Sequence, residues 1–166
     1  MESGLDEALK IMNKGYTAEE VIYELKRLKT AGMDYGANII FGATGSGRQE
    51  DNARTTAKLL NETKPYLIFT GTIHADAGCP LYDELKSGAF VEKTFEEYLD
   101  EEELLLSLLD LDDCLYFGLH PPNVVPMQGY LLEDKDVLMG EIWRKRKQLG
   151  KRLKERPRRG GEGAIV

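Results

Sequence analysis

The stretch Ala37-Asn38-Ile39-Ile40-Phe41, followed by Gly42-Ala43-Thr44-Gly45-Ser46-Gly47, decides the fold of this chain. The apolar run predicts a β-strand, and a helical pattern begins soon after the glycines. A strand that enters a helix through a glycine-rich turn brings backbone N–H groups and the positive end of a helix dipole to one edge of a sheet. The stretch therefore predicts where an anionic ligand would bind, and leaves its identity open.

The segments on either side of this stretch repeat the alternation of helix and strand. A helix is predicted from about Gln49 to Leu60, and a second apolar run, residues 66–71, follows Pro65. Neither run alternates with polar residues, which is typical of parallel strands covered on both faces. The predicted inner face of the helix consists of Ala53, Thr56, Ala57 and Leu60. These units indicate an α/β fold.

A helix is also predicted before the first strand. Thr17 and Glu20 have the spacing of a capping box, and Gly32 is placed to end that helix. Its apolar face would consist of Val21, Ile22, Leu25 and Leu28.

The pattern changes after about residue 75. Residues 79–82 are expected to be irregular, and Thr94 with Glu97 forms a second capping box at the start of an acidic helix that ends near Leu109. The acidic run 100–103 is expected to be the solvated face of that helix. Residues 115–118 predict a short strand, and a last amphipathic helix is expected from about Lys135.

Composition limits the classes of function. The chain has 166 residues, 42% of them hydrophobic, and a net charge of −7, which fits one domain with or without a tail. Residues 144–166 carry ten Lys or Arg and two acids, so the body before them is strongly acidic and general nucleic-acid binding is unlikely. Residues 144–166 are expected to be a basic, flexible tail that could bind phosphates or an acidic partner.

Cysteine usage and hydropathy suggest a location. The two cysteines, Cys79 and Cys114, are far apart and have no CxxC spacing, so they indicate neither a zinc site nor a disulfide framework. The chain shows no signal-peptide pattern and no apolar run of membrane-spanning length. We therefore expect a cytoplasmic protein that does not contact a membrane.

A series of short motifs runs along the chain. Glu2-Ser3-Gly4 comes first, then Lys14-Gly15 with Thr17, Ala31-Gly32, and the strand that ends at Gly42. Further motifs are Gly78-Cys79-Pro80-Leu81-Tyr82, residues 94–97, His120 with Asn123, and residues 129–135. In order and spacing they resemble the second half of the barrel of radical S-adenosylmethionine (SAM) enzymes and the region that follows it.

This resemblance implies an architecture. Residues 1–75 would form the last βα units of a partial (βα)6 TIM-type barrel, and residues 76–143 a mostly helical extension. The Glu2-Ser3-Gly4 tripeptide and the glycine turn would then lie side by side at one rim of the barrel. The extension is most similar to relatives grouped with oxygen-independent coproporphyrinogen oxidase, which gives a hint about the substrate.

The resemblance also implies cofactors and site residues. Glu2, with Ser3 beside it, would accept hydrogen bonds from the SAM ribose, and Asn38 would meet the same ribose. Ile40 and Gly42 match the backbone that packs against adenine. Lys14 is near a position where some relatives direct a basic residue toward the SAM carboxylate.

The iron–sulfur part of the family's motif set is absent from the sequence. Radical SAM enzymes hold a [4Fe–4S] cluster on a CxxxCxxC motif, and this chain contains no such motif. The resemblance therefore implies a fragment or split part of such an enzyme, inactive alone, with the cluster present only in a full-length or complemented form. The partner would be the missing N-terminal half-barrel or a second copy of the chain.

Two other interpretations of the same residues stay open. Gly42 to Gly47 followed by Arg48-Gln49 is close to the phosphate-binding loop GxxxxGK[ST], but the lysine and the hydroxyl that carry its chemistry are replaced. A non-catalytic nucleotide-binding or protein-interaction module using this loop and the basic tail is the alternative function. His74, Asp76 and Cys79 would form a polar loop after the second strand, where catalytic groups and metal ligands can collect.

Overall fold

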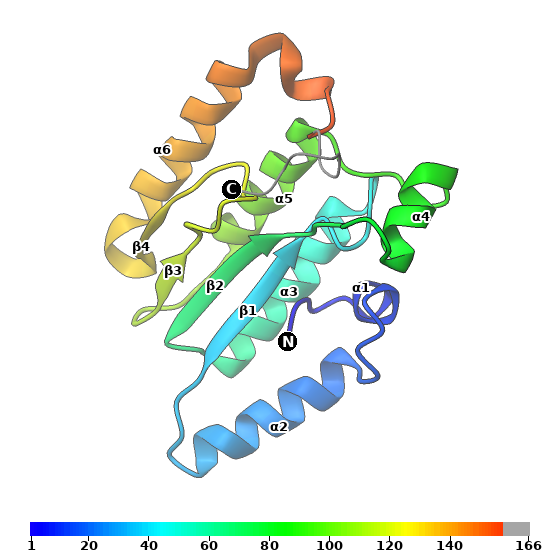
Figure 1. Cartoon of the computed structure of the whole chain (residues 1–166). Coiled ribbons are helices and arrows are strands. Elements are labelled where there is room, and N and C mark those ends of the chain that lie inside the picture. Colours follow the sequence, from blue (N-terminus) through cyan, green and yellow to red (C-terminus); the bar gives the residue numbers. More distant parts are fainter. Residues whose placement is uncertain (158–166) are drawn as a thin grey trace.

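The computed structural model describes residues 1–157 of the chain (Figure 1). Its helices are α1 (Asp6–Ile11), α2 (Ala18–Thr30), α3 (Gln49–Thr63), α4 (Pro80–Ser87), α5 (Phe95–Leu108) and α6 (Leu131–Leu149), followed by the 3-10 helix η1 (Gly150–Lys154). Its strands are β1 (Gly36–Phe41), β2 (Leu67–Thr72), β3 (Leu115–Phe117) and β4 (Gln128–Tyr130). The sheet has the order β1-β2-β3-β4, and only β4 is antiparallel to its neighbour. The α/β class and the first βα units are confirmed.

One face of the sheet carries the core. In Figure 1, α3 and α5 lie behind the strands, and α6 runs beside α5. The predicted inner face of α3 is confirmed, since Ala53, Thr56, Ala57 and Leu60 are all buried. Strand residues of the same face are also buried, and Ile39 and Ile68 are at most 1% exposed. In the described part of the chain, the hydrophobic core therefore lies between this face of the sheet and the helices that cover it.

The opposite face, which we call the open face, has no helix over it among residues 1–157 (Figure 1). Asn38 is exposed there, and Ile40 and Phe69 are half-buried. The expectation that β1 and β2 are covered on both faces is therefore wrong for the described part of the chain. The apolar residues of the open face explain the misleading pattern, because they keep each strand continuously apolar although only one face is packed.

The N-terminal segment lies beside the end of β1. The N–H of Ile40 donates to the Glu2 carbonyl at 2.9 Å, and the N–H of Gly4 donates to the Thr56 hydroxyl at 2.9 Å. Gly4 allows this approach, because a Cβ on it would lie 2.4 Å from the Thr55 carbonyl oxygen. The expected side-by-side placement of the tripeptide and the glycine turn is thus found.

Three element boundaries differ from the sequence expectation. Residues 80–87 form α4 instead of an irregular segment, with Pro80 in its first turn, where a missing N–H costs nothing. Strand β4 was not predicted, because three residues give too short a pattern to recognise. Helix α6 starts at Leu131, four residues before the expected Lys135.

Half of the acidic run on α5 is buried, so the expectation of a solvated face is wrong. Glu101 is 0% exposed and Glu102 is 3% exposed. Four consecutive residues span more than one helical turn, and α5 is packed between the sheet and α6, so part of the run must face inward. The Tyr116 hydroxyl donates to Glu102 Oε1 at 2.6 Å, and burial raises the pKa of Glu102 to about 8.

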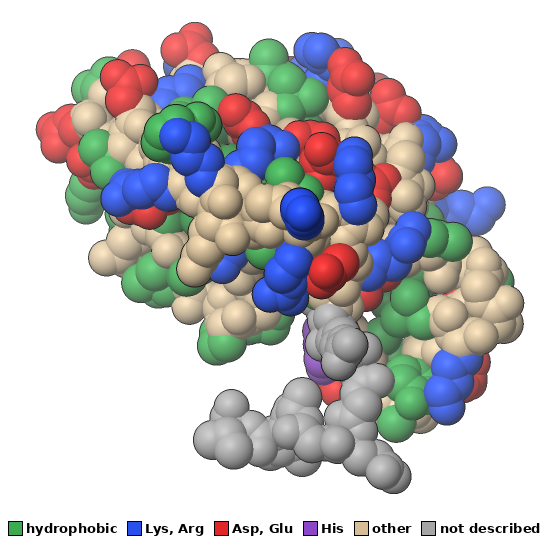
Figure 2. All heavy atoms as spheres, turned by 90° about the horizontal axis from the view of Figure 1, so that it is seen from above, with side chains coloured by type: hydrophobic (Ala, Val, Ile, Leu, Met, Phe, Trp, Pro, Cys, Tyr) green, Lys and Arg blue, Asp and Glu red, His purple; other side chains and the backbone are tan. Residues whose placement is uncertain are grey.

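The basic segment is ordered over much of its length. Residues 144–149 belong to α6, and Arg146 binds Asp100 at 2.9 Å and Glu103 at 2.6 Å. Lys154 of η1 pairs with Glu96. Basic and acidic side chains intermingle on the face seen from above (Figure 2). Residues 144–154 of the expected tail thus belong to α6 and η1, and residues 158–166 lie outside the described part.

Two glycines of the loop after β1, Gly42 and Gly47, differ in how closely other atoms surround them. Both have a left-handed backbone, with φ +83° at Gly42 and +88° at Gly47, but a Cβ at Gly42 would lie 2.6 Å from the Tyr98 ring whereas Gly47 has nothing within 4 Å. We expect Gly47→Ala to cost about 1 kcal/mol of unfolding free energy, from backbone strain alone. Gly42→Ala should cost about 3 kcal/mol, because steric overlap adds to that strain. Urea denaturation of both variants measures this, and equal losses would contradict the packing.

The buried Glu102 predicts a pH dependence of stability. Its folded pKa of about 8 is above the unfolded value of 4.5, so its stabilising contribution is complete below pH 4.5 and is lost as the pH rises toward 8. Glu102→Gln keeps an acceptor for Tyr116 and cannot ionise. Between pH 5.5 and 8.5 we expect wild type to lose about 3 kcal/mol of unfolding free energy relative to Glu102→Gln in urea denaturation. The exposed Glu133→Gln should follow wild type, and parallel curves for all three proteins would refute the assignment.

Candidate functional site

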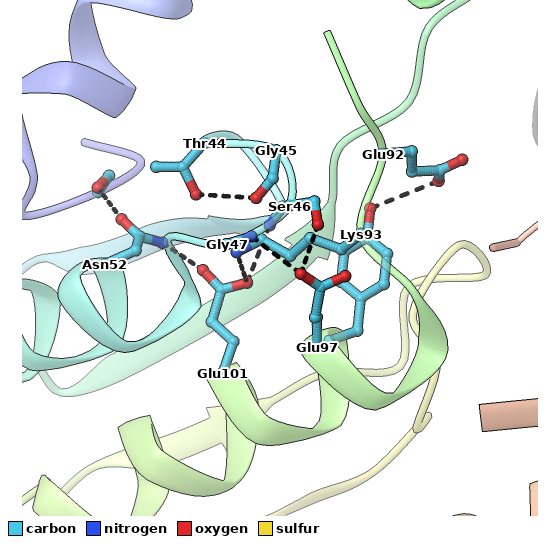
Figure 3. Close-up of polar contacts among 12 residues, drawn as sticks. Thr44, Gly45, Ser46, Gly47, Asn52, Glu92, Lys93, Glu97 and Glu101 are labelled. Carbon is cyan, nitrogen blue, oxygen red and sulfur yellow. Dashed lines mark hydrogen bonds and ion pairs between the residues drawn. The ribbon is translucent and has the colours of Figure 1, made fainter. Parts of the chain in front are cut away.

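Three donors of the glycine loop 42–47 bind carboxylates of the chain itself (Figure 3). Glu97 Oε1 accepts from the Ser46 hydroxyl at 2.6 Å and from the Gly47 N–H at 2.9 Å. The Gly42 N–H donates to Glu101 Oε2 at 3.2 Å. Two glutamates of α5 therefore occupy positions that a phosphate would take in a phosphate-binding loop.

The cation that follows the loop is also engaged. Arg48 pairs with Asp51 at 2.8 Å and with Glu7 at 2.6 Å. In the described part of the chain, both ion-pair partners of its guanidinium are therefore carboxylates of neighbouring helices. Loop 42–47 leads from β1 into α3 and is hydrogen-bonded to α5.

A buried polar network extends from Glu101 to the N-terminal segment. Asn52 Nδ2 donates to Glu101 Oε1 at 2.5 Å, and the Ser3 hydroxyl donates to Asn52 Oδ1 at 2.5 Å. Lys93 Nζ lies 3.4 Å from Glu101 Oε2, and both side chains are 0% exposed. Burial raises the pKa of Glu101, opposed by the Lys93 ammonium, and burial lowers the pKa of Lys93. The network fixes where residues 2–4 lie.

Glu2 is held at the C-terminal end of β1 as an ionised carboxylate. Lys14 Nζ lies 2.8 Å from Glu2 Oε1, and the Tyr16 hydroxyl donates to Oε2 at 2.9 Å. Partial burial alone would raise the pKa of Glu2, but these two hydrogen bonds, with the positive charges of Lys14 and of the Met1 ammonium, lower the pKa below 4.5. Burial and the contact with Glu2 raise the pKa of Tyr16 to about 12. A carboxylate has room for further donors beyond these two.

The structure brings together three of the residues expected to contact a cofactor. Glu2 lies next to Ile40 through the backbone hydrogen bond, and Asn38 and Ile40 share the open face. Asn38 is exposed and Ile40 is half-buried. These three residues form what we call the β1 rim.

The other three expected residues make contacts within the protein. Ser3 is 0% exposed and bonded to Asn52, so its role is to position Glu2. Gly42 is buried against the Tyr98 ring. Lys14 pairs with Glu2 and supports the carboxylate of the β1 rim.

The polar loop after β2 contains one pair. His74 Nε2 lies 2.8 Å from Asp76 Oδ1, with both side chains exposed, and Cys79 is the residue before α4. Among residues 1–157, no group of three His, Cys, Asp or Glu side chains could hold a metal ion.

Sequence analysis missed a cluster on the open face. The Phe69 and Phe117 rings stack with centroids 5.6 Å apart, and His120 meets Phe69 edge-on at 5.9 Å. Asn123 fixes the loop that carries His120, since its Nδ2 donates to the Thr70 and Gly118 carbonyls at 2.9 Å each. The paired positions of two phenylalanines on parallel strands were the available signal, but the register of β3 was needed to recognise it.

Comparison with known proteins identifies the fold. Neither a known protein family nor a curated protein matches the chain in sequence. The structure is similar to that of archaeal Methanocaldococcus infernus Elp3 with an N-terminal deletion, with a TM-score of 0.60 and 18% identity over 92% of this chain. The chain spans 35% of that protein. At 18% identity this likeness shows a shared α/β fold and no more than the fold.

Within residues 1–157, no helix combines the length and the apolar character that crossing a bilayer requires.

The contacts of Glu97 predict a second pH effect. Burial alone would raise its pKa, but hydrogen bonds from Ser46, Thr94 and Gly47 lower it. A lowered folded pKa gives stability that is present above pH 4.5 and is lost as the pH falls through the folded value. We expect Glu97→Gln to lower the unfolding free energy relative to wild type by about 1–2 kcal/mol at pH 7 and by less at pH 3.5, as measured by urea denaturation. A constant difference at both pH values would show that charge is not involved, and Glu133→Gln is the control.

Proposed function

We propose that this chain forms part of the barrel wall of a radical SAM protein, and that its β1 rim contacts the ribose and adenine of SAM. The observation that carries the proposal is the position of Glu2. Its backbone carbonyl accepts from the Ile40 N–H near the C-terminal end of a parallel strand, and its contacts favour the ionised carboxylate. The carboxyl ends of parallel strands are where α/β folds bind ligands. The likeness to Elp3 supports the fold that this proposal assumes.

The three residues of the β1 rim suit a nucleoside. Ribose hydroxyls are donors, and Glu2 is an acceptor whose charge is maintained by Lys14 and Tyr16. Asn38 offers an exposed amide that can donate and accept. Ile40 gives an apolar surface for the adenine ring. Bound SAM beside a reduced cluster would supply hydrogen-atom abstraction from a substrate.

The cluster itself does not fit this chain. The sequence contains two cysteines, and a [4Fe–4S] cluster in this family needs three thiolates. Cys114 is buried, and burial raises the pKa of its thiol to about 11, which opposes the thiolate form. We therefore propose that the cluster belongs to a partner half-barrel, which would also cover the open face, and we assign no electron-transfer step to this chain.

The contacts of the loop argue against the alternative function. A nucleotide-binding module would need the N–H groups of loop 42–47, and two of them already donate to Glu97 and Glu101. Phosphate would have to displace both carboxylates.

Ligand-dependent melting tests the proposal. A ligand that binds only the folded state raises the melting temperature, so SAM should stabilise the chain while Mg²⁺-ATP should not. Glu2→Gln and Asn38→Ala should each weaken SAM binding about 10-fold, which is the loss expected for one good hydrogen bond. Glu133→Gln is the control. Stabilisation by ATP but not by SAM, or equal SAM binding by all variants, would overturn the proposal.

A further inference from the structure

The open face of the sheet carries a second group of residues, one strand away from the β1 rim. Gly71 is the cross-strand neighbour of Ile40, and Phe69 is two residues earlier on the same strand and face. Phe117 pairs with Phe69 across β2 and β3. His120 follows β3. Its ring contacts Phe69 and lies next to Gly71. We call Phe69, Gly71, Phe117 and His120 the aromatic shelf.

The imidazole of His120 is positioned by packing against the sheet. Its backbone carbonyl accepts from the Asn123 N–H at 3.0 Å, and Asn123 is in turn bonded to β2, so the loop is fixed. The ring lies against the edge of Phe69, and a Cβ added at Gly71 would be 3.8 Å from its Nδ1. The absent side chain of Gly71 therefore gives the ring its place on the sheet.

The Nδ1 atom of His120 is buried and has no hydrogen-bond partner among residues 1–157. An unpaired buried nitrogen is uncommon in proteins, and such groups often mark functional sites. The Nδ1 and Cδ2 atoms of an imidazole are similar in size, so a 180° rotation of the ring exchanges their positions without changing its shape. The aromatic shelf thus offers a fixed aromatic surface with one unused hydrogen-bonding group.

We propose that the aromatic shelf binds a planar heteroaromatic molecule, with its ring on Phe69 and Phe117 and a polar ring atom bonded to His120. This site is distinct from the β1 rim, and it deepens the proposed function by assigning the chemical class of the substrate to the strand next to the SAM contacts. Stacked and edge-on aromatic contacts favour a flat conjugated ring over an aliphatic one of similar size.

The experiment uses benzimidazole as the probe and cyclohexanol as an aliphatic control. The chain has two histidines, so ¹⁵N-histidine labelling gives one set of ring signals for the shelf and one for the exposed His74. Benzimidazole should shift the ring nitrogens of His120 and leave those of His74 unchanged, and cyclohexanol should shift neither. Equal shifts of both histidines, or none at millimolar benzimidazole, would overturn the proposal.

Variants separate recognition from folding. His120→Phe keeps an aromatic ring on Phe69 and removes both nitrogens, and we expect at least 10-fold weaker benzimidazole binding in ligand-observed NMR with little change in melting temperature. Phe69→Leu should weaken binding about 3-fold, and His74→Phe should have no effect. Unchanged binding by His120→Phe would refute the role of the imidazole. Because SAM binding is measured on Glu2 and Asn38, failure of the SAM contacts and failure of the aromatic shelf give different results.

Discussion

The buried Glu101 carboxylate is the contact on which the rest of the structure depends. It accepts from the Gly42 N–H and from Asn52, and it faces the Lys93 ammonium. A buried charge is tolerated only where it is paired and hydrogen-bonded, so each of these groups constrains the others. The Ser3 hydroxyl donates to Asn52, and the position of Ser3 fixes that of its neighbour Glu2 beside β1. The position of the β1 rim is therefore determined from inside the core.

In this arrangement the glycine-rich loop has a different role from the one that its sequence predicts. In sequence the loop indicates an anion site, and in the structure its anions are side chains of α5. The same N–H groups and the same helix end stabilise the fold by binding Glu97 and Glu101. The ligand contacts that we propose lie instead on the open face of the sheet, which carries Asn38 on β1, Phe69 on β2 and Phe117 on β3.

Local signals in the sequence predicted much of the fold. The capping boxes at Thr17 and Thr94 can each be recognised from four consecutive residues, and both are present in the structure. Burial on one face or two is not a local property, so the apolar residues of β1 and β2 suggested a second layer that residues 1–157 do not supply. The inward half of the acidic run on α5 was missed for the same reason, since its partners Asn52 and Tyr116 are far away in sequence. For the site, Glu2, Asn38 and Ile40 followed from the order of motifs, whereas the aromatic shelf depends on the register of β3.

The antiparallel strand β4 has a consequence for how the sheet can grow. It ends the parallel order on the β3 side, so additional parallel strands can join only along β1. There the Glu2 carbonyl already takes the N–H of Ile40, and the remaining outward backbone groups belong to Gly36 and Asn38. A two-fold axis perpendicular to the sheet would place two β1 strands antiparallel, and such a pair would not continue the barrel that we propose. Under that proposal, strand polarity favours a different chain over a second copy of this one as the neighbour of β1.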